Sequence, residues 1–281
     1  MIQPSSNPFT SSVTSRAHVP TLVVFDIDGV VRDVGGSYRR ALADTVEHFT
    51  GEAYRPSLED IDALKAEGIW NNDWHASQEL IYRYFEAQGQ SRSQVNLEYE
   101  TLVAWFQSRY RGSDPEHWTG YICQEPLLLN PPYLESLNQA GIPWGFFSGA
   151  TQASALYVLE KRLGLQAPVL VAMEDAPEKP DPTGLLAAVH QLQQQHQVDS
   201  STPVIYVGDT VADLYTVQKA RKLVPARPWI GVGVLPPHVQ ETPERSAAYT
   251  KQLQEAGAAV IFNNVEQLTP AQIQALAGAI A

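Results

Sequence analysis

The sequence feature that most constrains the fold is an apolar segment that stops at two carboxylates. Thr21 to Phe25 (TLVVF) is β-branched or apolar throughout, and Asp26, Asp28 and Gly29 follow at once in the run DIDG. A strand that is apolar on both of its faces is typical of a parallel sheet covered by helices on both sides. The sequence therefore predicts a buried parallel strand with two carboxylates at its carboxyl end.

The chain beyond Pro126 alternates between amphipathic and strand-like segments. We expect helices over 131–140, 153–163, 183–193, 211–222, 244–256 and 270–279, and strands over 142–147, 168–173, 204–207, 229–234 and 259–262. Repeated strand–helix units favour a mostly parallel sheet with helices on both faces. We therefore predict an α/β fold, a Rossmann-like doubly wound sheet.

A purely helical region separates the first strand from these units. Apolar residues at helical spacing predict helices over 37–51, 57–68, 73–88 and 93–110. Ser57 and Asp60 have the spacing of a capping box at the start of the second helix. Because the first strand belongs with the later units, the helices are an insertion into one core. We predict a flexible tail at 1–19, a core at 20–36 and 127–281, and a helical cap at 37–126.

Polar residues suited to metal and phosphate chemistry follow four of the predicted strands. They are Asp26 and Asp28, then Ser148 with Gly149, then Lys179, and then Asp209 with Asp213. Ligands of such sheets bind beyond the carboxyl ends of the strands, so we expect these residues to converge. Carboxylate oxygens suit Mg²⁺, and lysine, serine and backbone N–H groups suit phosphoryl oxygens.

The same residues suit the attack of a carboxylate on a phosphate ester. Mg²⁺ held by Asp26 and Asp209 would offset the charge that keeps a carboxylate from an anionic ester. Asp26 would then form a covalent acyl phosphate. Asp28 would protonate the leaving oxygen and afterwards take a proton from the water that breaks the intermediate.

Four segments in this order resemble the motifs of the haloacid dehalogenase (HAD) superfamily. The segments are DIDGV at 26–30, Ser148 after an apolar strand, KPDP at 179–182 and GDTVAD at 208–213. The resemblance covers residues 20 to 235. It implies that Asp26 is nucleophile and metal ligand, and that Asp28 is acid/base and a metal ligand through its backbone carbonyl. It also implies phosphate binding by Ser148 and Lys179, Mg²⁺ binding by Asp209, and a ligand or supporting role for Asp213.

The helical insertion resembles the C1 cap of HAD subfamily IA, the phosphoglycolate-phosphatase-like members. Caps of this kind close over the site, exclude water and choose the substrate. The flap of the family would be GVVRDVGGS at 29–37, with Gly35 and Gly36 as a hinge.

Two groups of cap residues are candidates for reading the substrate. In GIWNNDWH at 68–75, Asn71 and Asn72 offer hydrogen bonds and Trp74 offers an aromatic wall. The alternative is that these asparagines cap a helix and the tryptophan packs in the cap core. Arg39 and Arg40, and also Arg32 in the flap, could meet a second anionic group of the substrate, or could be solvated.

Amino-acid composition limits which kinds of partner the protein can bind and in which cellular compartment we expect it. The chain has 31 acidic and 19 basic residues and a net charge of −12, which argues against nucleic-acid binding. Cys123 is the only cysteine, so no intrachain disulfide or cysteine metal cluster forms. No apolar run reaches the roughly 18 residues of a membrane span, and the first twenty residues lack a signal-peptide core. We expect a cytoplasmic protein with no membrane partner.

The function predicted from the sequence is a Mg²⁺-dependent phosphatase for a small phosphorylated metabolite. The alternatives are a sugar-phosphate mutase of the same superfamily and a non-catalytic ligand-binding protein of the same fold. A dehalogenase would not need Asp28, and a phosphonate hydrolase would need a cap lysine, for which Lys65 is the one candidate. The sequence leaves open the substrate, the oligomeric state, and the roles of the tail and of segment 236–250.

Overall fold

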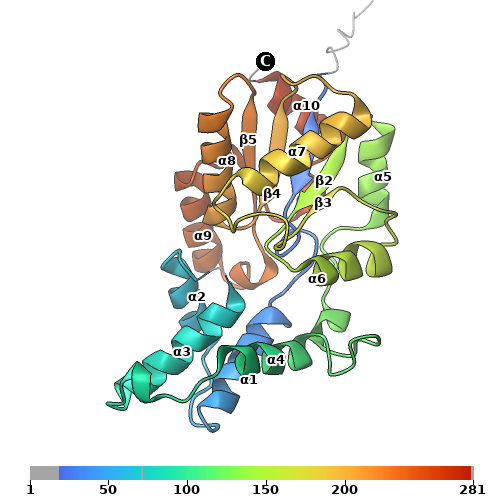
Figure 1. Cartoon of the computed structure of the whole chain (residues 1–281). Helices are drawn as coiled ribbons and strands as arrows, with labels where there is room; N and C mark the ends of the chain where they lie inside the picture. Colours follow the sequence, from blue (N-terminus) through green and yellow to red (C-terminus); the bar gives the residue numbers. More distant parts are fainter. Residues whose placement is uncertain (1–18, 71, 280–281) are drawn as a thin grey trace, which may run out of the picture.

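The computed structural model describes residues 19–70 and 72–279. The predicted tail at 1–19 therefore lies almost entirely outside the described residues. Figure 1 shows a sheet wrapped by helices, with a layer of further helices at one end of it.

The described residues form one six-stranded sheet in which every neighbouring pair is parallel. The strands are β1 (Leu22–Phe25), β2 (Trp144–Phe147), β3 (Leu170–Val171), β4 (Val204–Gly208), β5 (Trp229–Val234) and β6 (Val260–Phe262). Their order is β3-β2-β1-β4-β5-β6, so β1 lies in the centre. The predicted α/β class and parallel sheet are confirmed.

The central strand shows why its sequence is apolar throughout. All four residues of β1 are fully buried. Val23 and Phe25 belong to the hydrophobic cluster on one face of the sheet, whereas Leu22 and Val24 belong to the cluster on the other face. Because side chains alternate along a strand, a sheet covered on both faces needs apolar residues at every position.

Helices cover both faces of the sheet (Figure 1). The cluster around Phe25 contains residues of α5 (Pro131–Gln139), the π-helix η3 (Tyr157–Arg162) that continues α6 (Gln152–Leu156), η5 (Val265–Gln267) and α10 (Pro270–Gly278). The cluster around Val24 contains residues of α7 (Thr183–His196) and α8 (Val211–Leu223). A smaller cluster joins α8 to η4 (Pro237–Val239) and α9 (Pro243–Glu255).

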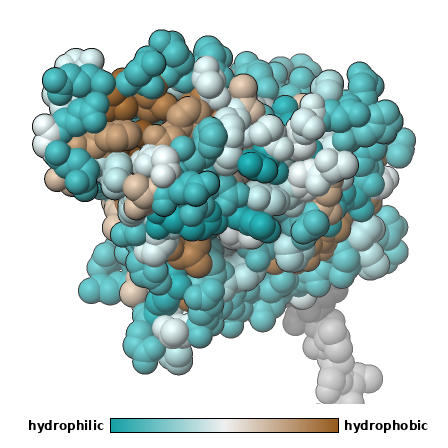
Figure 2. All heavy atoms as spheres, turned by 90° about the horizontal axis from the view of Figure 1, so that it is seen from below, coloured by the Kyte–Doolittle hydropathy of each residue, from teal (hydrophilic) through white to brown (hydrophobic). Residues whose placement is uncertain are grey.

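The remaining helices lie beyond the carboxyl ends of the strands. They are α1 (Tyr38–Phe49), α2 (Leu58–Ala66), α3 (Asp73–Ala87), η1 (Arg92–Gln94), α4 (Tyr99–Tyr110) and η2 (Tyr121–Gln124). They enclose a hydrophobic cluster of their own, and the capping box expected at Ser57 and Asp60 is present. We therefore propose that residues 37–126 are a cap domain. Seen from the cap end, the surface is mostly hydrophilic, with a larger hydrophobic area at the upper left (Figure 2).

The fourth cap helix begins later than predicted. A helix over 93–110 was expected, but α4 begins at Tyr99. Ser91 and Gln94 close a separate short turn with reciprocal cap hydrogen bonds, and Val95 after it is extended. Local side-chain capping competes with continuation of a helix, which explains the difference.

Two strands, β2 and β3, are shorter than predicted by two residues or more. β2 begins at Trp144 rather than 142, because Pro143 has no N–H to donate to a sheet. β3 is limited to Leu170–Val171 instead of 168–173, and it lies at the edge of the sheet, where it pairs with β2 alone.

Candidate active site

The ends of the central strands bring Asp26 and Asp209 together. Asp26 follows β1, and its backbone N–H donates to the Val207 carbonyl of β4 at 2.8 Å. Asp209 follows β4 directly. The order of the strands changes direction between β1 and β4, the place where sheets of this class bind ligands.

Three carboxylates crowd together at this position. One oxygen of each of Asp26, Asp209 and Asp213 lies within 4.8 Å of the others. Lys179 Nζ lies 2.8 Å from Asp26 Oδ1 and 2.7 Å from Asp213 Oδ1, which anchors the loop after β3 at the cluster. Within the part of the chain that the structure describes, these three negative charges face one lysine. The excess of negative charge and the oxygen donors fit a divalent cation such as Mg²⁺.

The pKa values of the cluster reflect this crowding. Burial raises the pKa of Asp26 to about 7, against the opposing effect of Lys179. Burial, and then the carboxylates of Asp213 and Asp26, raise the pKa of Asp209 well above its usual range. A bound cation would favour the ionised form of both side chains.

Asp213 is held more completely than its neighbours. Its Oδ1 accepts hydrogen bonds from Lys179 at 2.7 Å and from the Tyr206 hydroxyl at 3.0 Å. Its Oδ2 accepts from the backbone N–H and hydroxyl of Thr210, the N-cap of α8. Burial would raise the pKa of Asp213, but Lys179 and Thr210 outweigh burial and lower it. Since each oxygen already accepts two hydrogen bonds, the geometry favours the supporting role over direct ligation.

Two glycines make room for the carboxylates. Gly29 has φ +71°, and a Cβ there would lie 2.0 Å from Asp209 Oδ2. A Cβ at Gly208 would lie 2.3 Å from the side chain of Asp213. Both positions need glycine because any side chain would displace a carboxylate of the cluster.

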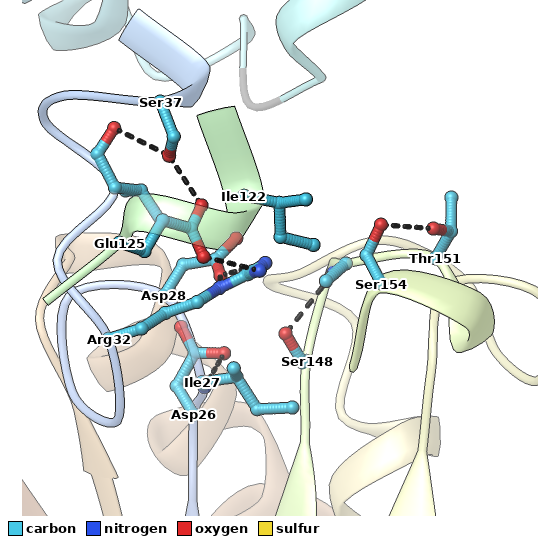
Figure 3. Close-up of polar contacts among 12 residues, drawn as sticks. Asp26, Ile27, Asp28, Arg32, Ser37, Ile122, Glu125, Ser148, Thr151 and Ser154 are labelled. Atoms are coloured by element: carbon cyan, nitrogen blue, oxygen red, sulfur yellow. Dashed lines mark hydrogen bonds and ion pairs between the residues drawn. The ribbon is translucent and has the colours of Figure 1, made fainter. Parts of the chain in front are cut away.

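Asp28 does not belong to the three-carboxylate cluster and contacts Arg32 instead. Asp28 Oδ1 lies 2.7 Å from Arg32 Nε and 2.6 Å from Nη2. Figure 3 shows the guanidinium of Arg32 between Asp28 and Glu125. The side chain of Arg32 is 0% exposed, whereas that of Asp28 is 29% exposed. The predicted acid/base is therefore accessible, but one of its oxygens is occupied.

Glu125 completes this buried network. It accepts from Arg32 Nη1 at 2.9 Å and from the hydroxyls of Ser37 and Tyr110. Burial raises the pKa of Glu125 to about 7, although Arg32 opposes the rise. Sequence reasoning did not single out Glu125 and Tyr110. The one available signal was Arg32, which lies four residues after Asp28 and directly follows the apolar pair Val30 and Val31.

The predicted phosphate-binding residues lie beside the cluster. Ser148 follows β2, is 1% exposed, and accepts from the Ala150 N–H at 3.1 Å (Figure 3). Gly149 is exposed, and a Cβ there would meet nothing within 4 Å. Lys179 carries the adjacent positive charge, and the peptide bond between Lys179 and Pro180 is cis. Phosphate contact by these residues stays a prediction.

The predicted substrate-reading residues of the cap are engaged in contacts within the protein. Arg39 pairs with Asp62 of α2, and the guanidinium of Arg40 lies 4.2 Å from the centre of the Tyr121 ring. Asn72 is the N-cap of α3, as in the alternative interpretation, and Trp74 packs against the cap core. Asn71 lies outside the described residues. Substrate contact by these residues stays a prediction.

Two cavities lie away from the carboxylates. One of about 440 Å³ lies at the amino ends of β2 and β3, beside Trp144 and His196. Another of about 390 Å³ lies in the cap between Leu64 of α2 and Leu80 of α3. The carboxylate cluster is the stronger candidate site because it combines buried charge, a cation-binding donor set and a strand-end position.

Among the described residues, no helix is both long and apolar enough to cross a bilayer.

Comparison with known protein families shows to which family the chain belongs. A family model described as haloacid dehalogenase-like hydrolase matches residues 20–221. The match covers well over half of the chain and includes Asp26, Ser148, Lys179 and Asp209. The chain belongs to the haloacid dehalogenase-like hydrolases. The hydrolase class predicted from the motifs is thereby confirmed.

Solved structures of similar shape agree with this fold. Phosphatase Tt82 from Thermococcus thioreducens is 24% identical, with a TM-score of 0.59 over 75% of this chain and 92% of that chain. A phosphonoacetaldehyde hydrolase-like protein from Oleispira antarctica is 16% identical, with a TM-score of 0.64 over 93% of this chain and 95% of that chain. At these identities the likeness concerns the fold of the hydrolase.

A curated protein is also similar in sequence. The imidazoleglycerol-phosphate dehydratase of Phytophthora nicotianae is 29% identical over 250 residues. The alignment covers 85% of this chain and 49% of that protein. The hydrolase thus spans about half the length of the curated relative it matches.

Proposed function

We propose that this haloacid dehalogenase-like hydrolase is a Mg²⁺-dependent phosphatase that acts on a small phosphate monoester through an aspartyl phosphate at Asp26. The observation that carries the proposal is the buried cluster of Asp26, Asp209 and Asp213 around Lys179. Asp26 and Asp209, with the backbone carbonyl of Asp28, would hold Mg²⁺, which supplies the charge that lets a carboxylate approach an anionic ester.

The chemistry of this chain follows in two steps. An oxygen of Asp26 attacks phosphorus, the bond from phosphorus to the ester oxygen breaks, and Asp28 gives that oxygen a proton. Water then attacks phosphorus of the acyl phosphate, Asp28 takes the proton, and inorganic phosphate and free Asp26 are regenerated. Lys179 and Ser148 would hold phosphoryl oxygens through both steps.

The residues of the site argue against two of the alternative functions and leave the third to be distinguished by its products. A phosphonate hydrolase would need a cap lysine, but Lys65 pairs with Asp73 inside the cap at 2.7 Å. A non-catalytic binding protein would not need the nucleophile that this chain retains. A mutase would use the same core residues, so only its products distinguish it from a phosphatase.

The deciding test is phosphate release from a panel of phosphorylated metabolites, with Mg²⁺ or with EDTA. The panel should hold hexose 1-phosphates, phosphoglycolate and imidazoleglycerol phosphate, the last because of the name of the curated relative. We expect release by the wild type with Mg²⁺, and a loss of about 1000-fold or more in Asp26→Asn, which lacks a nucleophile.

Two other outcomes would contradict the phosphatase. Isomerisation of a hexose phosphate without release would establish a mutase. Saturable binding of a panel compound, unchanged in Asp26→Asn and without turnover, would establish a binding protein.

A further inference from the structure

Arg32 holds Asp28 by one carboxylate oxygen only. Both short contacts from the guanidinium, at 2.7 Å and 2.6 Å, go to Asp28 Oδ1. Within residues 19–70 and 72–279, no hydrogen bond reaches Oδ2. The side chain is therefore fixed in orientation while its second oxygen stays available to a leaving group or a water.

The side chain of Arg32 is itself fixed by residues of the cap and its connections. Its Nη1 donates to the Tyr110 hydroxyl at 2.7 Å and to Glu125 Oε2 at 2.9 Å. Glu125 in turn accepts from the hydroxyl of Ser37, which precedes α1. Tyr110 ends α4, and its ring stacks on Tyr38 of α1 with 4.1 Å between the ring centres.

The two chain segments that join core and cap also pair with each other at this point. Asp33 N–H donates to the Pro126 carbonyl at 2.9 Å, and Leu128 N–H donates to the Val31 carbonyl at 2.8 Å. Arg32 and Leu127 form an antiparallel bridge between the same segments. These two segments are the covalent connections between core and cap, so a movement of the cap relative to the core changes their conformation. Arg32 lies in one of them.

We propose that Arg32 is a positioning residue that couples the seating of the cap to the orientation of Asp28. With the cap seated, Glu125 and Tyr110 hold Arg32, and Arg32 turns Asp28 so that Oδ2 faces the substrate. With the cap displaced, the buried guanidinium loses acceptors from the cap and its connection, and Asp28 loses its fixed orientation. The inference rests on the proposed phosphatase function, in which Asp28 delivers the proton to the leaving oxygen.

A comparison of two leaving groups separates this role from a merely structural one. An alkyl phosphate needs a proton on its leaving oxygen, whereas 4-nitrophenyl phosphate releases a stable anion and hardly needs one. The ratio kcat/KM reports the steps up to departure of the leaving group, provided that this departure is irreversible. A change that acts through Asp28 should therefore affect the two esters unequally.

The variant Arg32→Lys keeps the positive charge but cannot contact Asp28, Glu125 and Tyr110 together. We expect its kcat/KM to fall about 100-fold for the alkyl ester and less than about 3-fold for the aryl ester. In Asp28→Asn, kcat/KM should again fall more for the alkyl ester than for the aryl ester, and the difference between the two esters should be larger than in Arg32→Lys. As a matched control, Arg227→Lys changes a buried arginine that donates to the Ser200 carbonyl, and it should leave both esters unchanged.

An equal fall for both esters in Arg32→Lys would overturn the inference. If that variant does not fold, the double variant Arg32→Met with Glu125→Gln removes both buried charges and is measured instead. An unchanged ratio of the two esters in the folded double variant would equally overturn it. A wild type that releases phosphate from neither ester would contradict the phosphatase function itself, and this inference with it.

Discussion

Asp209 is the carboxylate of the cluster that most lacks a compensating charge. Asp26 and Asp213 both contact Lys179, and Asp213 also receives hydrogen bonds from Thr210 and Tyr206. Burial and the carboxylates of Asp213 and Asp26 raise the pKa of Asp209 well above the usual range, and the opposing effect of Lys179 does not outweigh them. Ionisation of Asp209 is therefore unfavourable in the metal-free protein, and a divalent cation would offset that cost.

Replacement of Asp209 by asparagine should raise the stability of the metal-free protein and reduce its stabilisation by Mg²⁺. In EDTA we expect Asp209→Asn to unfold at a higher temperature than the wild type, because a buried repulsion is removed. Mg²⁺ at about one hundred times its Kd should stabilise the wild type by roughly 3 kcal/mol and the variant far less. Thermal unfolding with and without Mg²⁺ measures both effects. Asp114→Asn on the cap surface is the control, and an equal Mg²⁺ response in Asp209→Asn would rule out Asp209 as a ligand.

At the scale of elements, an ion pair of Asp62 connects α2 of the cap to α9 of the core. Asp62 pairs with Arg39 of α1 and with Arg245 of α9, the latter at 2.7 Å. This contact gives segment 236–250, whose role the sequence left open, a place at the boundary between core and cap. All three side chains are partly exposed, so each pair contributes about 1 kcal/mol or less.

Removal of this tie should loosen the cap without unfolding the protein. We expect Asp62→Asn to change the free energy of unfolding by about 1 kcal/mol or less and to increase amide hydrogen exchange in α2. Exchange in α7, which packs on the sheet, should not change. Glu241→Gln removes the other partner of Arg245 at the surface and should leave α2 unaffected. Equal exchange in α2 for wild type and Asp62→Asn would show that the pair does not hold the cap.

At the scale of the whole molecule, the boundary between core and cap also holds a half-buried histidine, His238. Burial lowers the pKa of His238 to about 4, with Arg39 and Arg245 adding to the effect and Asp62 opposing it. The ordinary value is 6.5, so the folded protein disfavours the charged ring. A group with a lowered pKa stabilises the fold above its ordinary value, and this contribution is lost as the pH falls towards the folded value.

We expect His238→Gln to flatten the dependence of stability on pH between 6.5 and 4 relative to the wild type. The wild type should lose up to about 3 kcal/mol of unfolding free energy through His238 in this window, reduced by the partial exposure of the ring. Urea unfolding at several pH values measures the difference. Exposed His117→Gln is the control, and parallel curves for wild type and His238→Gln would refute the prediction.

The sequence alone was enough to predict the elements that depend on local pattern. The fully apolar β1, the capping box at Ser57 and Asp60, and the α/β alternation after Pro126 all follow from side-chain periodicity and backbone chemistry. The ordered strand-end residues predicted which side chains should meet, because the carboxyl ends of parallel strands share one edge of the sheet. Boundaries such as the start of α4 failed where side-chain capping competed with helix continuation.

Only the tertiary structure decided how these side chains are used. Arg32 and Glu125 are 93 residues apart in the chain, yet they form a buried pair beside Asp28. Arg39 and Asn72, which the sequence offered to a substrate, contact Asp62 and the first turn of α3 instead. Local sequence specifies which groups are present and the spacing along one element. The pairing of charged side chains depends on packing between elements that are distant in sequence. The periodicity of one element does not predict that packing.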